Sequence, residues 1–336
     1  MTHQSRPGEF DLISSYFKPL AKNESGALGL TDDAAVLNIR NGHRLVVTMD
    51  TLVSGVHFLE FTPPHFIAAK ALRVNLSDLA AMGADPAYYT LSLSLPTFGD
   101  VSYNEDWLDR FSQALGVEQS LYNIVLVGGD TVSTPGPLSL TISAFGWVKT
   151  GQEILRSGAS IEDLVFVSGT VGDAMLGLAA VQGSFPDLTP SDLEIITERH
   201  HRPQPRLQLG RRLFGLANSA IDISDGLIQD LEHICTASGV TATIRATDIP
   251  LSGPGKKLID DDPDLIKTIL SGGDDYELLF TIPPEWKSSI SSLAKELGLP
   301  LTQIGEIEAK RSGDSVSVYD ACGNLMSIPA SGYRHF

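Results

Sequence analysis

The 336-residue sequence carries 24 Lys and Arg against 41 Asp and Glu, which gives a formal net charge of −17 at pH 7. This length favours two domains, and a hydrophobic share of 42% is ordinary for a globular protein, which excludes wholesale disorder and fibrous repeats. The strong acidity excludes a protein that holds nucleic acid or an anionic membrane by bulk electrostatics. It does not exclude polyanionic ligands, because bound metal cations can reverse the local charge.

The cysteines and the apolar segments indicate the compartment. Cys235 and Cys322 are far apart and belong to no metal-binding spacing, so we expect two reduced thiols and neither a zinc site nor a disulfide framework. The N-terminus is polar and lacks the apolar segment of a secretory signal. The most apolar stretch, residues 164–181, is interrupted by Asp173 and several glycines, so it is not a membrane span. We expect a soluble, cytoplasmic protein.

Short apolar runs alternate with helix-like stretches along the whole chain, which is typical of a mixed α/β protein. In the first half we expect strands over 44–49, 87–95, 124–127 and 138–145, and a helix over 64–82 that ends at Gly83. In the second half we expect strands over 164–168, 219–223 and 277–282, a strand and loop within 240–270, and helices over 174–182, 194–216 (interrupted by Pro203 and Pro205) and 226–238. The first half closes near Trp147, so the predicted domains are 1–148 and 149–336.

Aspartates recur where the predicted strands end, beside Gly, Ser or Thr. They are Asp32, Asp33, Asp50, Asp130, Asp222, Asp225, Asp274 and Asp275, and Asp78 is added from the middle of a predicted helix. Any one of them alone would be interpreted as a turn former or a helix N-cap. Strand ends are, however, where an α/β scaffold presents ligand-binding groups, and carboxylates that share a site repel one another unless a cation lies between them. The recurrence therefore favours a multi-metal site of Mg²⁺ type that handles phosphate.

The familiar phosphate-binding motifs do not occur in the sequence. It contains no P-loop, no G-x-G-x-x-G, no protein-kinase signature set and no nucleophile elbow. Arg156 is either a bidentate phosphate ligand or an ordinary surface arginine. The densest positive run, between Arg199 and Arg212, is interpreted as a solvated helix face with local ion pairs. His57 gains interest only because it follows Asp50 closely.

An ordered set of segments resembles the thiamine-monophosphate kinase family over nearly the whole chain. These segments are residues 31–37, 50–53 with 57–58, 71–86, 128–131, 156–159, 222–227, 271–278 and 332–336. The sequence departs from the family pattern at three positions: Thr31 replaces a common glycine, Asp274 replaces a frequent glutamate, and Ala330 stands where some members have an aromatic residue.

The resemblance implies an ATP-dependent kinase that converts thiamine monophosphate to thiamine diphosphate by direct in-line transfer, the last step of thiamine diphosphate biosynthesis. It implies the two-domain α/β fold of the aminoimidazole-ribonucleotide synthetase superfamily, a homodimer joined through strands of the N-terminal domains, and ATP with several Mg²⁺ ions at the domain junction. The Mg²⁺ ligands it implies are Asp33, Thr48, Met49 (through its carbonyl), Asp50, Asp78, Asp130, Asp222 and Asp225. It places Gly129, Asp130, Arg156 and Ser224 at the nucleotide, and His57, Asp274, Ala330 and Tyr333 at the thiamine substrate. No dedicated catalytic side chain is expected, because the acceptor phosphate oxygen is already anionic.

Two alternatives stay open. The first is another member of the same superfamily with a different acceptor, although the cysteines lie at neither the N-terminal nor the C-terminal position that such relatives use. The second, from a different class, is a non-catalytic regulator that binds nucleotide or divalent cations. Such a regulator needs no acceptor site, so formation of thiamine diphosphate discriminates between them.

Overall fold

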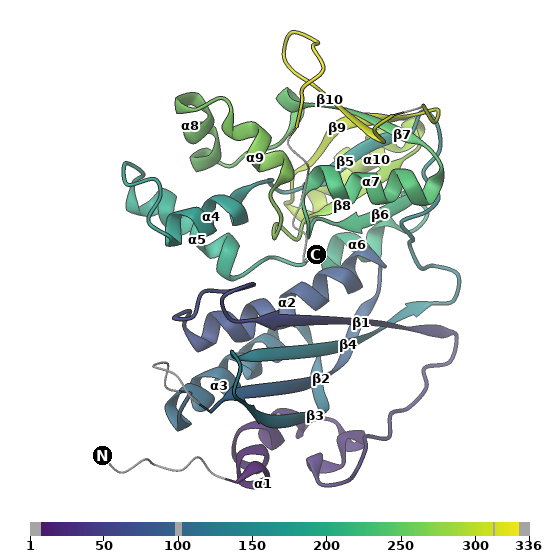
Figure 1. Ribbon diagram of the computed structural model, residues 1–336. Helices are drawn as coiled ribbons and strands as arrows, with labels where there is room; N and C mark the ends of the chain where they lie inside the picture. Colours follow the sequence, from purple (N-terminus) through teal and green to yellow (C-terminus); the bar gives the residue numbers. More distant parts are fainter. Residues whose placement is uncertain (1–7, 98–102, 312, 329–336) are drawn as a thin grey trace. The chain divides into compact units, whose positions relative to one another are not determined.

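A computed structural model describes residues 8–97, 103–311 and 313–328, and the chain divides into two compact units (Figure 1). Unit 1 comprises the chain up to Leu79 together with Asp85–Thr150, and unit 2 comprises Ala80–Ala84 together with the chain from Gly151 onward. Each unit contains one β-sheet with helices packed on it, so the predicted mixed α/β class is confirmed. No helix among the described residues is long and apolar enough to cross a membrane.

The sheet of unit 1 has the strand order β1-β4-β2-β3, so β1 and β3 form its edges. Its strands are β1 (His43–Val53), β2 (Asp85–Pro96), β3 (Val125–Thr134) and β4 (Ser139–Lys149). Strands β2 and β3 are parallel, and the other pairs are antiparallel. Two long helices, α2 (Pro64–Ala81) and α3 (Glu105–Tyr122), lie on one face of the sheet (Figure 1). Short helical segments contact one another and β3: α1 (Glu9–Leu12), η1 (Ile13–Phe17), η2 (Lys18–Ala21) and η3 (Ser25–Leu30).

The local sequence explains these elements. In β2, Tyr89, Leu91 and Leu93 are buried while the residues between them are partly exposed, which is the period-two pattern of a strand with one covered face. Helix α3 begins where the side chain of Asn104 accepts a hydrogen bond from the Trp107 amide at 3.0 Å. The face of the sheet that the two long helices cover is therefore the core of unit 1.

Two of the strands of unit 1 are longer than the sequence indicated. Strand β1 continues to Val53 and β3 continues to Thr134, so Asp50 and Asp130 lie inside strands, and the prediction that they stand at strand ends is wrong. Strand β4 pairs with β1 along its whole length, which keeps the chain extended beyond Asp50. In β3 the extension depends on Gly129, because a Cβ there would lie 2.0 Å from the carbonyl oxygen of Leu91.

The sheet of unit 2 has the order β10-β7-β9-β5-β8-β6. Its strands are β5 (Leu164–Ser168), β6 (Ser219–Asp222), β7 (Thr241–Arg245), β8 (Leu278–Ile282), β9 (Leu301–Glu308) and β10 (Val316–Tyr319). Its helices are α4 (Asp173–Val181), α5 (Pro190–His201), α6 (Leu207–Leu213), α7 (Leu227–Ser238), η4 (Ala246–Asp248), α8 (Gly253–Asp261), α9 (Leu265–Ser271), η5 (Pro284–Trp286) and α10 (Lys287–Leu297). Every residue of β5 and β8 is buried, so these strands form the centre of the core. The strands expected near 164, 219 and 277 are confirmed, whereas α8 and α9 were expected to be loop.

Candidate functional site

The first group of candidate metal ligands is Thr48, Asp50 and Asp78, which β1 and α2 bring together in unit 1. Thr48 and Asp50 are two residues apart in β1, so their side chains lie on the same face of the sheet. The Thr48 hydroxyl donates to Oδ2 of Asp78 at 2.5 Å. Burial, together with the negative charge of Asp78, raises the pKa of Asp50 from 3.8 to about 7. A divalent cation would relieve this repulsion, and the three oxygen ligands suit Mg²⁺.

The raised pKa of Asp50 predicts a specific pH dependence of stability. Because the folded-state pKa lies above the unfolded value, the folded protein holds an extra proton between about pH 4 and pH 7, so the metal-free protein gains stability as the pH falls through 7. Asn at this position cannot titrate. We expect the melting temperature of the metal-free wild type to rise more between pH 8 and pH 6 than that of Asp50→Asn, as measured by calorimetry. Identical pH profiles of the melting temperature for the wild type and Asp50→Asn would contradict a raised pKa of Asp50.

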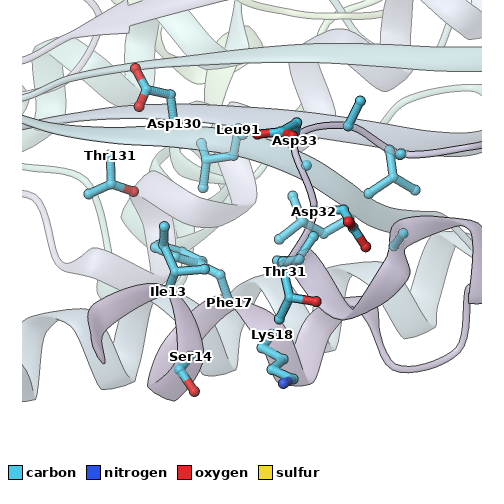
Figure 2. Close-up of a pocket in the computed structure, with 18 of the residues that line it drawn as sticks. Ile13, Ser14, Phe17, Lys18, Thr31, Asp32, Asp33, Leu91, Asp130 and Thr131 are labelled. Atoms are coloured by element: carbon cyan, nitrogen blue, oxygen red, sulfur yellow. The ribbon is translucent and has the colours of Figure 1, made fainter. Parts of the chain in front are cut away.

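The second group of acids lines a cavity of about 490 Å³ beside β3. Three carboxylates, those of Asp32, Asp33 and Asp130, and the ammonium of Lys18 are among its lining groups. Figure 2 shows Asp33 and Asp130 on the same side of the cavity, with Phe17 on the opposite side. Apolar side chains complete much of the lining: Phe10, Ile13, Phe17, Leu30, Leu91 and Leu126. The cavity is thus lined partly by acidic and partly by apolar side chains.

The sheet keeps these two acid groups apart within one chain. Asp130 is in register with Ser92, which is in register with Thr141 and through it with Thr51 of β1. Asp130 therefore shares a face with Thr51, and the neighbouring Asp50 faces the opposite side. Three strand spacings separate β1 from β3, a distance of about 14 Å. The predicted metal ligands of unit 1 thus form two groups at opposite edges of the sheet.

The third group lies in unit 2, where Asp222 is the last residue of β6 and the loop of residues 223–226 leads into α7. Asp222 is buried, while Ser224 and Asp225 are partly exposed. This loop is hydrogen-bonded to residues 274–276: the Asp274 amide donates to the Ser224 carbonyl at 2.9 Å, and the Tyr276 amide donates to the Ile223 carbonyl at 2.8 Å. The structure therefore brings the predicted nucleotide ligand Ser224 beside the predicted substrate ligand Asp274.

Asp274 has a strained backbone. Its φ is +70° and that of Tyr276 is +51°, in the left-handed region that L-residues rarely adopt. The Tyr276 hydroxyl donates to Oδ1 of Asp274 at 3.3 Å. Backbone strain of this kind persists only where surrounding contacts hold it, and it concentrates at functional sites.

Two buried acids hold this segment: Asp275, one of the recurring aspartates to which the sequence assigned no ligand role, and Glu277, which it did not single out. Asp275 accepts the amides of Gly172 and Ala174, at 2.6 and 3.2 Å, at the start of α4. The fully buried Glu277 accepts from both Arg199 and Arg206. Asp275 lies between the two strained residues and Glu277 follows them, so these acids tie the segment to the core. The Gly-Gly-Asp-Asp-Tyr-Glu segment was the only available signal, and it does not say which acids point inward.

The cluster around Glu277 also corrects the interpretation of the basic run. Arg206 Nε donates to Glu277 at 2.6 Å, and the Ser168 hydroxyl donates at 2.5 Å. Arg199 and Arg206 are therefore largely buried partners of an acid, and their assignment to a solvated face is wrong. The prediction holds for Arg212, which pairs with Glu296 on the surface.

Asp225 belongs to a second small cluster that the sequence missed. The ligand atoms of Asp225, Asp230 and His233 all lie within 4.8 Å of one another, and Oδ2 of Asp225 also accepts a hydrogen bond from Gln229 Nε2 at 2.9 Å. Asp230 and His233 follow one turn apart on α7, and their proximity to the loop depends on the turn before the helix.

The remaining predicted ligands are dispersed. In unit 1, Nδ1 of His57 accepts the Val53 amide at 3.0 Å, so a neutral ring carries its proton on Nε2. The side chain of Met49 is exposed on β1. In unit 2, Arg156 is exposed. Ala330 and Tyr333 lie outside the described residues.

Comparisons with known proteins agree with this fold. Models of the N-terminal and C-terminal domains of AIR synthase related proteins match residues 31–148 and 160–317. The chain thus has the two-domain fold of AIR synthase related proteins. Thiamine-monophosphate kinase of Escherichia coli (strain K12) is 43% identical over 330 residues, which are 98% of each chain. The chain belongs to the thiamine-monophosphate kinase family.

Two solved structures extend the comparison. Thiamine-monophosphate kinase from Stenotrophomonas maltophilia K279a is 44% identical, with a TM-score of 0.77, over 86% of this chain and 89% of that one. The structure of AaThiL complexed with AMPPCP and TMP is 31% identical, with a TM-score of 0.76, over 100% of both chains.

Proposed function

We propose that the chain transfers the γ-phosphate of ATP to thiamine monophosphate and so forms thiamine diphosphate. The observation that carries this proposal is the full-length likeness to AaThiL complexed with AMPPCP and TMP, and to relatives named thiamine-monophosphate kinase. Both cysteines are free thiols, which agrees with a cytoplasmic location.

We propose that the chain holds several Mg²⁺ ions through oxygen ligands. These ligands are Asp33, Thr48, the Met49 carbonyl, Asp50, Asp78, Asp130, Asp222 and Asp225. The fit is supported by the all-oxygen donor set and by the raised pKa of Asp50 beside Asp78. When bound, Mg²⁺ neutralises the charge of the phosphate oxygens and orients them for in-line displacement.

The chain's own residues bind and orient the two substrates. Gly129, Asp130, Arg156 and Ser224 are proposed for the nucleotide, where the exposed guanidinium of Arg156 can bind a phosphate with two hydrogen bonds. His57, Asp274, Ala330 and Tyr333 are proposed for thiamine monophosphate, and the hydrogen bond from the Val53 amide to Nδ1 orients the His57 ring. An oxygen of the acceptor phosphate attacks the γ-phosphorus, and the bond to the β–γ bridging oxygen breaks to release ADP. The attacking oxygen is already anionic, so no general base is required.

We infer that the protein is a homodimer joined through the sheets of unit 1. Leu45, Val47 and Met49 on the edge strand β1 are 48, 55 and 65% exposed and share one face of the sheet, an apolar row that favours a protein partner. If the β1 edge of one protomer meets the β3 edge of its partner, the strands that carry Asp50 and Asp130 become neighbours across the interface. A second copy would thereby place side by side the two sheet edges, each with its acid group, that one chain keeps about 14 Å apart.

Subunit complementation tests this arrangement. Asp50→Asn and Asp130→Asn should each be inactive, but random mixing of the two should restore about a quarter of wild-type activity, because half of the dimers are hybrids and each hybrid has one intact site. The readout is thiamine diphosphate formed after the variants are unfolded together and refolded. A monomer by sedimentation, or a mixed dimer without recovered activity, would contradict a site shared between copies.

The function itself is tested by incubating the protein with ATP, Mg²⁺ and thiamine monophosphate and separating the products. Thiamine diphosphate and ADP in equal amounts are the expected result. Nucleotide binding without product would instead favour the non-catalytic regulator or a different acceptor.

A further inference from the structure

The side chain of Asp230 accepts hydrogen bonds from a group of backbone amides that could otherwise bind an anion. Asp230 is 2% exposed, and its Oδ2 accepts hydrogen bonds from three consecutive backbone N–H groups: Ser224 at 3.0 Å, Asp225 at 3.1 Å and Gly226 at 3.1 Å. Successive amides that converge on one point just before a helix are the geometry that binds phosphate in many proteins. Here an internal carboxylate fills that position.

This contact differs from an ordinary helix cap. Helix α7 begins at Leu227 after Gly226, which offers no side chain, and Asp230 reaches back from inside the helix to amides that precede it. Its hydrogen bonds therefore shape the loop as well as the helix. The opposite side of the loop is fixed too, because the Asp274 amide donates to the Ser224 carbonyl. Gly226 has a φ of +134°, and a Cβ there would lie 2.7 Å from the Ser271 carbonyl oxygen.

The arrangement determines which charge the loop can bind. With their N–H groups directed to Asp230, residues 224–226 have no amides left for an ATP phosphate. The carboxylate of Asp230 also compensates the positive end of the α7 dipole. What the loop offers is the Ser224 hydroxyl and the carboxylates of Asp222 and Asp225, which are ligands for a cation.

We propose that Asp230 is a positioning residue. By accepting the hydrogen bonds of the amides of residues 224–226, it holds the loop in the conformation that binds Mg²⁺ and prevents phosphate from binding to these amides. This inference rests on the proposed function, in which Asp222, Ser224 and Asp225 bind Mg²⁺ and nucleotide. Asp230 itself touches neither substrate in this account.

Three variants separate positioning from general stability. Asp230→Ala removes the acceptor, and Asp230→Asn keeps one oxygen in nearly the same place. Asp163→Ala is the matched control, since Asp163 is also 2% exposed in unit 2 and accepts the Ser160 amide at 2.9 Å and the Asn218 side chain. Mg²⁺-dependent binding of a non-hydrolysable ATP analogue is measured by calorimetry, and amide hydrogen exchange is measured at residues 224–226.

For Asp230→Ala we expect the half-saturating Mg²⁺ concentration to rise about 10- to 100-fold, with faster exchange at residues 224–226 and a KM for thiamine monophosphate within about threefold of wild type. Inorganic phosphate should raise the melting temperature of Asp230→Ala more than that of the wild type. Asp230→Asn should recover most of the Mg²⁺ affinity, and Asp163→Ala should lose melting temperature but not Mg²⁺ affinity.

The proposal is overturned if folded Asp230→Ala binds Mg²⁺ like the wild type, if Asp163→Ala shifts the Mg²⁺ requirement equally, or if phosphate does not distinguish Asp230→Ala from the wild type. Should Asp230→Ala fail to fold, Asp230→Asn decides: exchange at residues 224–226 and Mg²⁺ affinity must change together. Failure of the proposed function is a separate result, namely a wild type that shows no Mg²⁺-dependent nucleotide binding.

Discussion

Asp50→Asn and Asp130→Asn should each lower kcat/KM for thiamine monophosphate by at least about 100-fold, because each removes a carboxylate proposed to hold Mg²⁺ near the transferred phosphate. Asn keeps the size of the side chain and removes its charge. For Asp50 the substitution also removes the repulsion with Asp78, so the folded protein should be at least as stable as the wild type. The measurement is steady-state kinetics over a range of Mg²⁺ concentrations.

The combination of lost activity and retained stability distinguishes a metal ligand from a structural residue. Asp264→Asn is the control, since Asp264 is an exposed acid paired with Lys267, and it should behave like the wild type. Wild-type rates for Asp50→Asn and Asp130→Asn at limiting Mg²⁺ would show that the site is misplaced.

Glu277→Ala should destabilise the protein by about 3–5 kcal/mol, because it leaves Arg199 and Arg206 largely buried without the carboxylate that pairs with both. For a unit of this size, that loss corresponds to a fall in melting temperature of about 10 °C. The same substitution releases the segment that carries Asp274, so the KM for thiamine monophosphate should rise in whatever protein stays folded. Calorimetry and steady-state kinetics give the two readouts.

Glu296→Ala is the matched control for this substitution. Glu296 also binds an arginine through two hydrogen bonds, at 2.5 and 2.9 Å, but both partners are half-exposed or more. Water and salt screen such a pair, so its loss should leave the melting temperature nearly unchanged. Equal effects of Glu277→Ala and Glu296→Ala would contradict the structural role assigned to the buried cluster.

The sequence predicted the fold class and most strands because hydrophobic periodicity is a local property. The alternation in β2 and the continuous apolar runs of β5 and β8 are visible without any tertiary information. The ends of β1 and β3 were missed because they depend on pairing with distant strands, and pairing overrides the turn preference of Asp50-Thr51 and Gly129-Asp130.

The sequence predicted which residues belong to the candidate site, but it did not predict which of them lie close together. Tertiary packing brings Asp78 of α2 to Thr48 and Asp50 of β1, and it places Asp33 and Asp130 in the lining of one cavity. No spacing along the chain encodes these neighbours. The roles of Asp230 and Glu277 could not be predicted from the sequence either. An acid that accepts hydrogen bonds from three amides or two guanidinium groups is the same residue type as an acid exposed to solvent. Only its burial and its partners distinguish it.

The most direct test of the central claim is to follow the label from ATP carrying radioactive phosphorus in the γ position, in the presence of Mg²⁺ and thiamine monophosphate. Direct transfer predicts that the label appears in the terminal phosphate of thiamine diphosphate, in proportion to the ADP formed. Label that appears only as inorganic phosphate, or stays in ATP while nucleotide is bound, would contradict the assignment of this chain as a thiamine-monophosphate kinase.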